Sequence, residues 1–216
     1  MLKLENVYYR YKNGDRYILK NLSYEFKTGK LHAIVGPSGT GKTTLLSIIA
    51  GLGRPTEGKI FIGYRDLSAI DLNKYRRENI TMIFQSFHLF PLLTALENVS
   101  YLLESRGIKR KDAEARAREL LNIVGIDESK HRRYPANLSG GEQQRVAIAR
   151  SLSTGAKLIL ADEPTGNLDL ANSDAVVGIL QNLAHQEDYC VIVVTHNPAI
   201  ADASDVVLRM SDGMFV

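Results

Sequence analysis

The chain has 216 residues, 44% hydrophobic and 24% charged, with a net charge of +3, so it is long enough to bury a core as one large or two small domains. The small positive charge gives no strong case for a nucleic-acid partner, and a single cysteine excludes an intramolecular disulfide. No signal peptide is recognisable, and no apolar run approaches the roughly 18 residues that span a bilayer. We therefore expect a protein that is soluble by itself and reaches a membrane only through a partner.

The hydrophobic pattern predicts an α/β core with a helical insert. Strand patterns occupy 2–7, 18–26, 31–36, 58–67 and 80–85, and a helix is predicted over 43–51. From about Thr94 to Ser153 the pattern is helical, with amphipathic segments at 94–105 and 110–124. Strand patterns return at 157–164, 189–196 and 205–210, around a helix near 172–186. A helical insert of roughly 60–70 residues thus interrupts an α/β core.

The segment "GPSGTGKT" matches the phosphate-binding loop G-x-x-x-x-G-K-[ST] in full, between an apolar strand and a helix. Glycine N–H groups can surround phosphate oxygens there, and the helix N-terminus adds a favourable dipole. We expect Lys42 to contact the β- and γ-phosphates and the Thr43 hydroxyl to bind Mg²⁺. The predicted nucleotide-binding residues of this segment are Gly36, Pro37, Ser38, Gly39, Thr40, Gly41, Lys42, Thr43 and Thr44.

Polar side chains follow three of the predicted strands, where ligands of parallel sheets bind. Asp162 and Glu163 follow "LILA", and we expect Asp162 to hold Mg²⁺ and Glu163 to act as general base on the attacking water. His196 follows "CVIVV" and could bond the γ-phosphate and that water; a structural histidine is the alternative. Gln85 ends another strand where the helical insert begins, and its amide oxygen can ligate Mg²⁺. These residues form the predicted catalytic and metal site.

The stretch "NLSGGEQQRVAIAR" begins a helix in an unusual way. Ser139 and Glu142 form a capping-box pattern, yet Gly140 and Gly141 occupy the first turn. Each glycine costs about 0.5–1 kcal/mol relative to alanine in a helix. We interpret the two glycines as room for an anionic group that approaches from outside.

Six motifs, "GPSGTGKT", Gln85, "LSGGEQ", "LILADEP", "NLD" and "THN", occur here in the order found in ATP-binding cassette (ABC) ATPases. The chain resembles this family over essentially its whole length. The resemblance implies a P-loop NTPase fold, α/β, with a RecA-like core, an antiparallel β subdomain and an inserted helical subdomain. It implies a single domain over 1–216, with core and β subdomain at about 1–85 and 156–216, and the helical subdomain at about 86–155.

The resemblance also implies roles for residues that the motif chemistry leaves open. Tyr11 matches the aromatic residue that stacks on adenine, although ordinary packing of one of the neighbouring tyrosines is the alternative. The signature motif, Ser139, Gly140, Gly141 and Glu142, would bind the γ-phosphate held by a second copy of the chain. Asp169 matches the D-loop, which crosses the dimer interface. The implied cofactors are ATP and Mg²⁺, and the implied partner is an ATP-dependent homodimer.

Two longer stretches, "YPANLSGGEQQRVAIAR" and "ADEPTGNLD", are similar to the subgroup with lipoprotein-release, macrolide and peptide-export, and cell-division ABC ATPases. In that subgroup the surface after Gln85 receives a coupling helix from a membrane permease. Here Phe87, Leu89, Phe90 and Leu92 could line this groove or pack internally.

Two functions remain open at this point. The chain would either drive a separate integral membrane subunit in export, lipoprotein release or mechanotransmission, or control an extracytoplasmic enzyme through that subunit without transport. Both place it in the cytoplasm, peripheral on the inner face of the membrane. No nucleic acid is expected as a partner, and the sequence does not identify a transported substrate.

Overall fold

Two β-sheets organise the fold, and a computed structural model describes residues 1–12 and 14–216 of the chain. The larger sheet has the strand order β10-β9-β3-β8-β7-β6, and all neighbours in it are parallel except β10 and β9. Its strands are β3 (Lys30–Val35), β6 (Ile80–Phe84), β7 (Leu158–Asp162), β8 (Cys190–Val194), β9 (Val206–Ser211) and β10 (Met214–Phe215). The four-stranded sheet is antiparallel, in the order β2-β1-β4-β5. Its strands are β1 (Leu2–Tyr9), β2 (Leu19–Phe26), β4 (Glu57–Ile62) and β5 (Arg65–Asp66).

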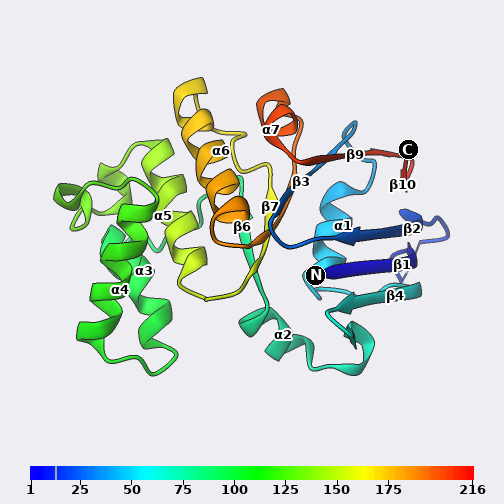
Figure 1. The fold of residues 1–216 in the computed structure, drawn as a ribbon, viewed down its shortest axis with the longest axis horizontal. Coiled ribbons are helices and arrows are strands. Elements are labelled where there is room, and N and C mark those ends of the chain that lie inside the picture. Colours follow the sequence, from blue (N-terminus) through cyan, green and yellow to red (C-terminus); the bar gives the residue numbers. More distant parts are fainter. Residues whose placement is uncertain (13) are drawn as a thin grey trace.

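The parallel strands are apolar because both faces of their sheet are covered. Alternate residues of β7 point into two different cores, since side chains alternate along a strand. Ile159 and Ala161 pack in the core with α5 (Gly140–Leu152) and α6 (Leu170–His185). Leu158 and Leu160 pack in the other core with α1 (Lys42–Ile49) and the antiparallel sheet. The larger sheet therefore separates the two cores, with α6 on one side and α1 on the other (Figure 1).

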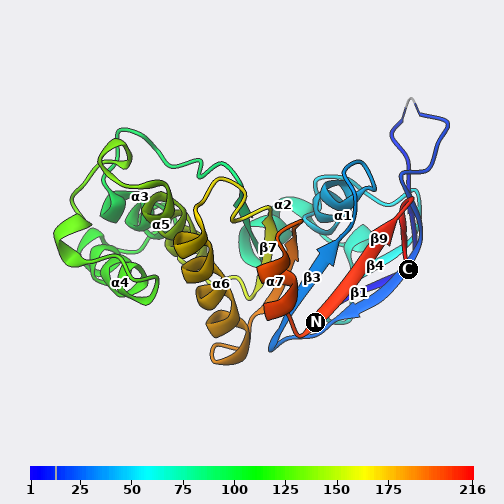
Figure 2. The ribbon, with the colours of Figure 1, turned by 90° about the horizontal axis from the view of Figure 1, so that it is seen from above.

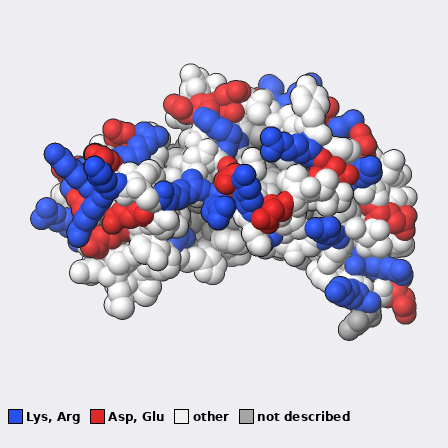
Figure 3. All heavy atoms as spheres, turned by 90° about the horizontal axis from the view of Figure 1, so that it is seen from below, with Lys and Arg blue, Asp and Glu red and all other residues white. Residues whose placement is uncertain are grey.

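Three helices, α3 (Ala95–Glu104), α4 (Arg110–Ile123) and α5, form a layer at one end of the molecule (Figures 1 and 2). Thr94 caps α3 with a capping box that includes Glu97. The exposed side of α4 carries ion pairs such as Arg110 with Glu114, at 2.9 Å. Basic and acidic side chains accordingly lie mixed over this end in Figure 3. The helical layer lies where the helical insert was predicted. The bounds of a helical subdomain at about 86–155 stay a prediction.

The structure differs from the sequence-based expectation in its short elements. The single strand expected over 58–67 is two strands, β4 and β5, because the chain turns at Gly63 with φ +59°, a conformation that glycine adopts without strain. Two short helices, α2 (Leu72–Glu78) and α7 (Pro198–Ala203), and the strand β10 were not predicted. Among the described residues, no helix is both long and apolar enough to cross a membrane.

Candidate functional site

The phosphate-loop segment joins β3 to α1, and the structure shows why its glycines are needed. A Cβ on Gly36 would lie 2.1 Å from the Met210 carbonyl oxygen of β9. Gly41 has φ +100°, and a Cβ there would lie 3.0 Å from Leu19 Cδ2. The loop is thus pressed against the neighbouring strands, in a path that side chains would block.

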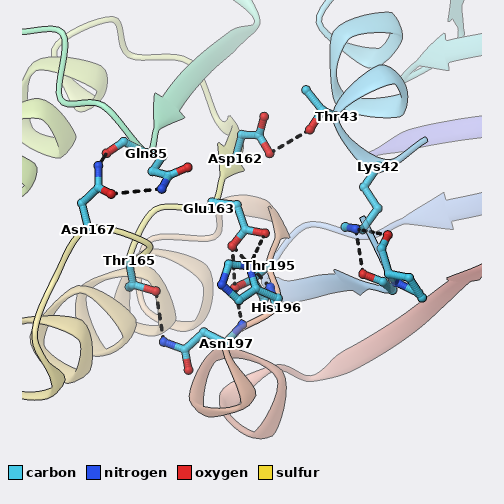
Figure 4. Close-up of polar contacts among 12 residues, drawn as sticks. Lys42, Thr43, Gln85, Asp162, Glu163, Thr165, Asn167, Thr195, His196 and Asn197 are labelled. Carbon is cyan, nitrogen blue, oxygen red and sulfur yellow. Dashed lines mark hydrogen bonds and ion pairs between the residues drawn. The ribbon is translucent and has the colours of Figure 1, made fainter. Parts of the chain in front are cut away.

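Lys42 begins α1 and turns its ammonium back into this loop (Figure 4). Its side chain is nearly buried, with 9% exposure, and Nζ donates to the carbonyl oxygens of Gly36 and Pro37 at 2.8 Å each. The Thr40 hydroxyl also donates to the Pro37 carbonyl, at 2.9 Å. The loop therefore wraps a buried positive charge, as a phosphate site requires.

A cleft of about 440 Å³ lies beside this loop, within the roughly 300–1,000 Å³ range of ligand pockets. It is lined by Tyr11, Ile18, Ser38, Gly39, Gly41, Lys42, Thr43, Thr44, Glu163 and Val194. Tyr11 is 56% exposed, and its hydroxyl lies 3.4 Å from Thr44 Oγ1. The nearby Tyr17 instead bonds Glu57 and packs edge-on against Tyr8. Of these tyrosines, Tyr11 is the one placed in the cleft where a base could stack.

Asp162 ends β7 and meets Thr43 at the start of α1. The Thr43 hydroxyl donates to Asp162 Oδ1 at 3.3 Å. Burial raises the pKa of Asp162 above its ordinary value, opposed by this hydrogen bond. A hydroxyl and a carboxylate oxygen are hard ligands that suit Mg²⁺. Within the described parts of the chain, no cluster of three His, Cys, Asp or Glu side chains could hold a metal, so an ion here would need further oxygens, such as those of a phosphate.

Glu163 and His196 lie in contact because they follow adjacent parallel strands, β7 and β8. Glu163 Oε1 and His196 Nδ1 are 2.8 Å apart, and Glu163 Oε2 accepts from the His196 N–H at 3.3 Å (Figure 4). The Thr195 hydroxyl donates to the same Oε2 at 3.4 Å. Glu163 has φ +49°, which is uncommon for a residue with a side chain and often marks a functional position. The structure thus joins the predicted general base to the predicted histidine.

Gln85 follows β6 and is held by a residue that the sequence analysis missed. Gln85 Nε2 donates to Asn167 Oδ1 at 3.0 Å, and Asn167 Nδ2 donates to the Gln85 carbonyl at 3.2 Å. The two residues are 82 positions apart in the chain. Only the neighbouring positions of β6 and β7 bring them together, and no local pattern could have paired them.

The capping box predicted for the signature motif is present. The Glu142 N–H donates to Ser139 Oγ at 3.3 Å, and the Ser139 N–H donates to Glu142 Oε2 at 2.9 Å. An ion pair with Lys130, followed by the Ser139 N–H, lowers the pKa of Glu142. The cap therefore contains a carboxylate that is ionised and held in place.

The two glycines of this turn are not equivalent. A Cβ on Gly140 would make only ordinary contacts, 3.7 Å to Phe87 and 3.9 Å to Leu168. A Cβ on Gly141 would lie 1.9 Å from Asn172 Oδ1 of the same chain. Packing against α6 is therefore one reason for a glycine at 141, and the role of both glycines in admitting an anionic group from outside stays a prediction.

Gln144 is a second residue that sequence reasoning missed. It is fully buried in α5, and its Nε2 donates to the carbonyls of Pro164, at 2.7 Å, and Phe84, at 3.3 Å. Pro164 directly follows Glu163 in the chain, and Phe84 directly precedes Gln85. The sequence did contain a signal for this residue, because a glutamine on an otherwise apolar helix face indicates a buried polar contact.

The signature turn and the phosphate loop lie on different parts of the chain. α5 packs on α3, α4, α6 and β6, whereas α1 packs on β7 and β8. Figures 1 and 2 place α5 with the helical layer and α1 beside the antiparallel sheet. The cleft is lined by core residues and Tyr11 of the β1–β2 connection.

Comparison with known proteins identifies the family. Residues 19–166 match the family model ABC_tran, described as ABC transporter. The chain belongs to the ABC transporter family. It is 44% identical over 215 residues to the ABC transporter ATP-binding protein YclH of Bacillus subtilis, covering 100% of this chain and 95% of YclH. It is 42% identical over 218 residues to the lipoprotein-releasing system ATP-binding protein LolD of Chromohalobacter salexigens, covering 99% and 92%.

A solved structure shows the same architecture. The ATP-binding cassette MJ0796, in a dimeric post-hydrolysis state bound to ADP and Pi, matches with a TM-score of 0.88 and 39% identity, over 100% of this chain and 96% of that one. The predicted family and fold class are confirmed. The protein is the ATP-binding subunit of an ABC transporter and, as a member of this ATP-hydrolysing family, an ATPase.

Proposed function

We propose that this ATPase closes as an ATP-sandwich homodimer and that closure drives a separate integral membrane permease. The supporting observation is that α5, which begins at the signature turn, and α1, which begins after the phosphate loop, pack in different cores on the two faces of the larger sheet. A cleft with its own lysine, hydroxyl and carboxylate, but without the signature turn in its lining, supports the proposal of a composite site. A second copy would supply Ser139, Gly140, Gly141, Glu142 and Asp169 to the nucleotide bound by the first.

In the proposed mechanism each polar group exchanges its present partner for nucleotide or water. The Lys42 ammonium leaves the carbonyls of Gly36 and Pro37 for the β- and γ-phosphate oxygens. Thr43 and Asp162 would hold Mg²⁺, which neutralises charge that develops on the phosphates. These residues then fix the phosphates in line for attack.

The attacking water would be held by the strand-end residues. Glu163 orients and polarises the water as general base, at the position where it now bonds His196. His196 would bond the γ-phosphate, and Gln85, held by Asn167, would offer its amide oxygen to Mg²⁺ and the water. Tyr11 stacks on the base.

A surface near Gln85 fits an apolar partner. Phe90 and Leu92 are 41% and 86% exposed, and Tyr101 of α3 packs edge-on against Phe90. Leu89, by contrast, packs on the core. We infer that the exposed members receive a coupling helix of the permease, so that the protein works in the cytoplasm on the inner face of the membrane. The names of two relatives support an export-type role: LolD belongs to a lipoprotein-releasing system, and MacB of Salmonella typhi, 43% identical over 222 residues, is a macrolide export ATP-binding/permease protein.

The proposal is tested by measuring whether the protein forms a homodimer when it binds ATP. In Glu163→Gln, ATP binding should persist while hydrolysis nearly stops, so gel filtration with ATP and Mg²⁺ should show a dimer. The same variant with ADP is the control and should elute as a monomer. Strictly monomeric elution at high concentrations of protein and ATP would contradict the proposal.

A second assay separates the two roles left open by the sequence. With the cognate membrane subunit present, movement of a substrate supports transport. Activation of a cell-wall hydrolase without any movement would instead support control of an extracytoplasmic enzyme.

A further inference from the structure

Asn172, the third residue of α6, bridges two segments with opposite charges. Its Nδ2 donates to both carboxylate oxygens of Asp169, at 3.0 and 2.9 Å. Its Oδ1 accepts from Arg145 NH1 of α5, at 3.1 Å. The amide dipole is therefore aligned between a carboxylate and a guanidinium, the arrangement in which both hydrogen bonds are charge-assisted.

Asn172 also fills the space beside Gly141. A Cβ at position 141 would lie 1.9 Å from Asn172 Oδ1, 2.1 Å from its Cγ and 2.7 Å from its Cβ. Because even the Cβ is too close, rotation of the Asn172 side chain would not make room. Contact with α6 in the same chain is thus sufficient reason for a glycine at 141.

The side chain of Asn172 is separable from the cap of α6. Asp169 caps this helix by accepting from the main-chain N–H of Asn172, at 2.8 Å. Any residue at 172 except proline keeps that N–H. A substitution at 172 therefore removes the bridge to Arg145 and Gly141 without removing the cap.

We propose that Asn172 is a positioning residue that locks Asp169 onto the first turn of α5, so that the D-loop and the signature turn approach a partner copy as one unit. This inference rests on the proposed ATP-dependent homodimer, in which one subunit offers both elements to the nucleotide of the other. Without the lock, each element would have to be ordered separately as the dimer closes, which weakens association.

The first experiment measures dimer formation. In the Glu163→Gln background, Asn172→Ala should raise the ATP-dependent dimer dissociation constant about tenfold. Binding of a fluorescent ATP analogue to dilute monomer, and the melting temperature, should stay close to those of the parent. The matched control is Asn182→Ala, an exposed asparagine further along α6, which should dimerise like the parent.

The outcomes separate this inference from the homodimer proposal. If Glu163→Gln dimerises and Asn172→Ala dimerises equally well, the positioning role is overturned and the homodimer stands. If analogue affinity and melting temperature fall together with dimerisation, Asn172 is merely structural and the inference is overturned. If Glu163→Gln itself stays monomeric, the homodimer fails and this inference fails with it.

A size-exchange experiment tests the contact directly. Gly141→Ala should lower ATP hydrolysis about tenfold or more, because its methyl group displaces α6. The double variant Gly141→Ala with Asn172→Gly should recover the activity and melting temperature of Asn172→Gly alone. A double variant that regains neither the melting temperature nor the activity of Asn172→Gly would show that the Asn172 contact is not what requires the glycine, and would overturn the inference.

Discussion

At the scale of single residues, the charged groups of the site are all partnered within the chain. Lys42 donates to loop carbonyls, Glu163 bonds His196, and Asp162 accepts from Thr43. Buried charges require such partners, since an unpaired one is costly to desolvate. Nucleotide binding is therefore an exchange of partners, and each exchange can be tested by removing one group.

Lys42→Ala removes the charge that the loop surrounds. Hydrogen bonds to charged groups contribute about 1.5–3 kcal/mol, so ATP affinity should fall roughly 10–100-fold. Equilibrium titration with a fluorescent ATP analogue measures this. Lys157→Ala, a lysine that bonds the Glu187 carbonyl away from the cleft, is the control and should bind normally. Normal affinity in Lys42→Ala would refute the phosphate-loop assignment.

Asp205 gives a prediction on pH and stability. Burial by itself raises its pKa, but hydrogen bonds from the Leu31 N–H, His185 and Lys30 outweigh it and lower the pKa to about 2. A lowered carboxyl pKa means that the stabilisation is present above the ordinary value of 3.8 and is lost as pH falls through about 2.

Asp205→Asn should therefore destabilise the fold at neutral pH, by about 1–2 kcal/mol after allowance for solvent screening. Urea unfolding at a series of pH values measures the difference between the two proteins. That difference should shrink as the pH falls from about 4 towards 2. A difference that does not shrink in this range would contradict the assignment.

At the scale of elements, α5 is tied to the ends of two strands by Gln144. Gln144→Leu preserves the volume but leaves the buried carbonyls of Phe84 and Pro164 without this donor, at a cost of about 1–3 kcal/mol. Because these carbonyls adjoin Gln85 and Glu163, kcat for ATP should fall more than KM changes. Urea unfolding and steady-state kinetics measure the two effects. A loss of stability with unchanged kcat would show that Gln144 stabilises the fold but does not position Gln85 and Glu163.

At the scale of the whole molecule, a composite site predicts complementation. Ser139→Arg should block closure from the signature side, and Lys42→Ala should disable the phosphate loop, so neither variant hydrolyses ATP alone. In a mixed dimer of the two, one site keeps an intact phosphate loop and an intact signature turn. Random mixing should then restore up to about a quarter of wild-type hydrolysis. No recovery, with both variants folded by circular dichroism and mixed dimers shown by cross-linking, would contradict sites shared between subunits.

The parts of the site that could be predicted from sequence are contiguous in the chain. The phosphate loop, the two carboxylates at the end of β7 and the capping box of Ser139 and Glu142 depend on backbone conformation within a few residues. Long periodic helices and buried strands were predicted for the same reason. Short elements such as α2 and α7 were missed, because six or seven residues carry too little periodicity to outweigh their surroundings.

Local residue patterns predicted an α/β core with a helical insert and a phosphate-binding loop, and the order of six motifs along the chain indicated the family. Which distant residues meet could be learned only from the packing of the folded chain. Strand order placed Asn167 on Gln85 and Glu163 on His196, and helix packing placed Asn172 against Gly141. The physical reason is that hydrophobic periodicity specifies which face of an element is buried, while the partner on that face follows from the packing of the whole chain.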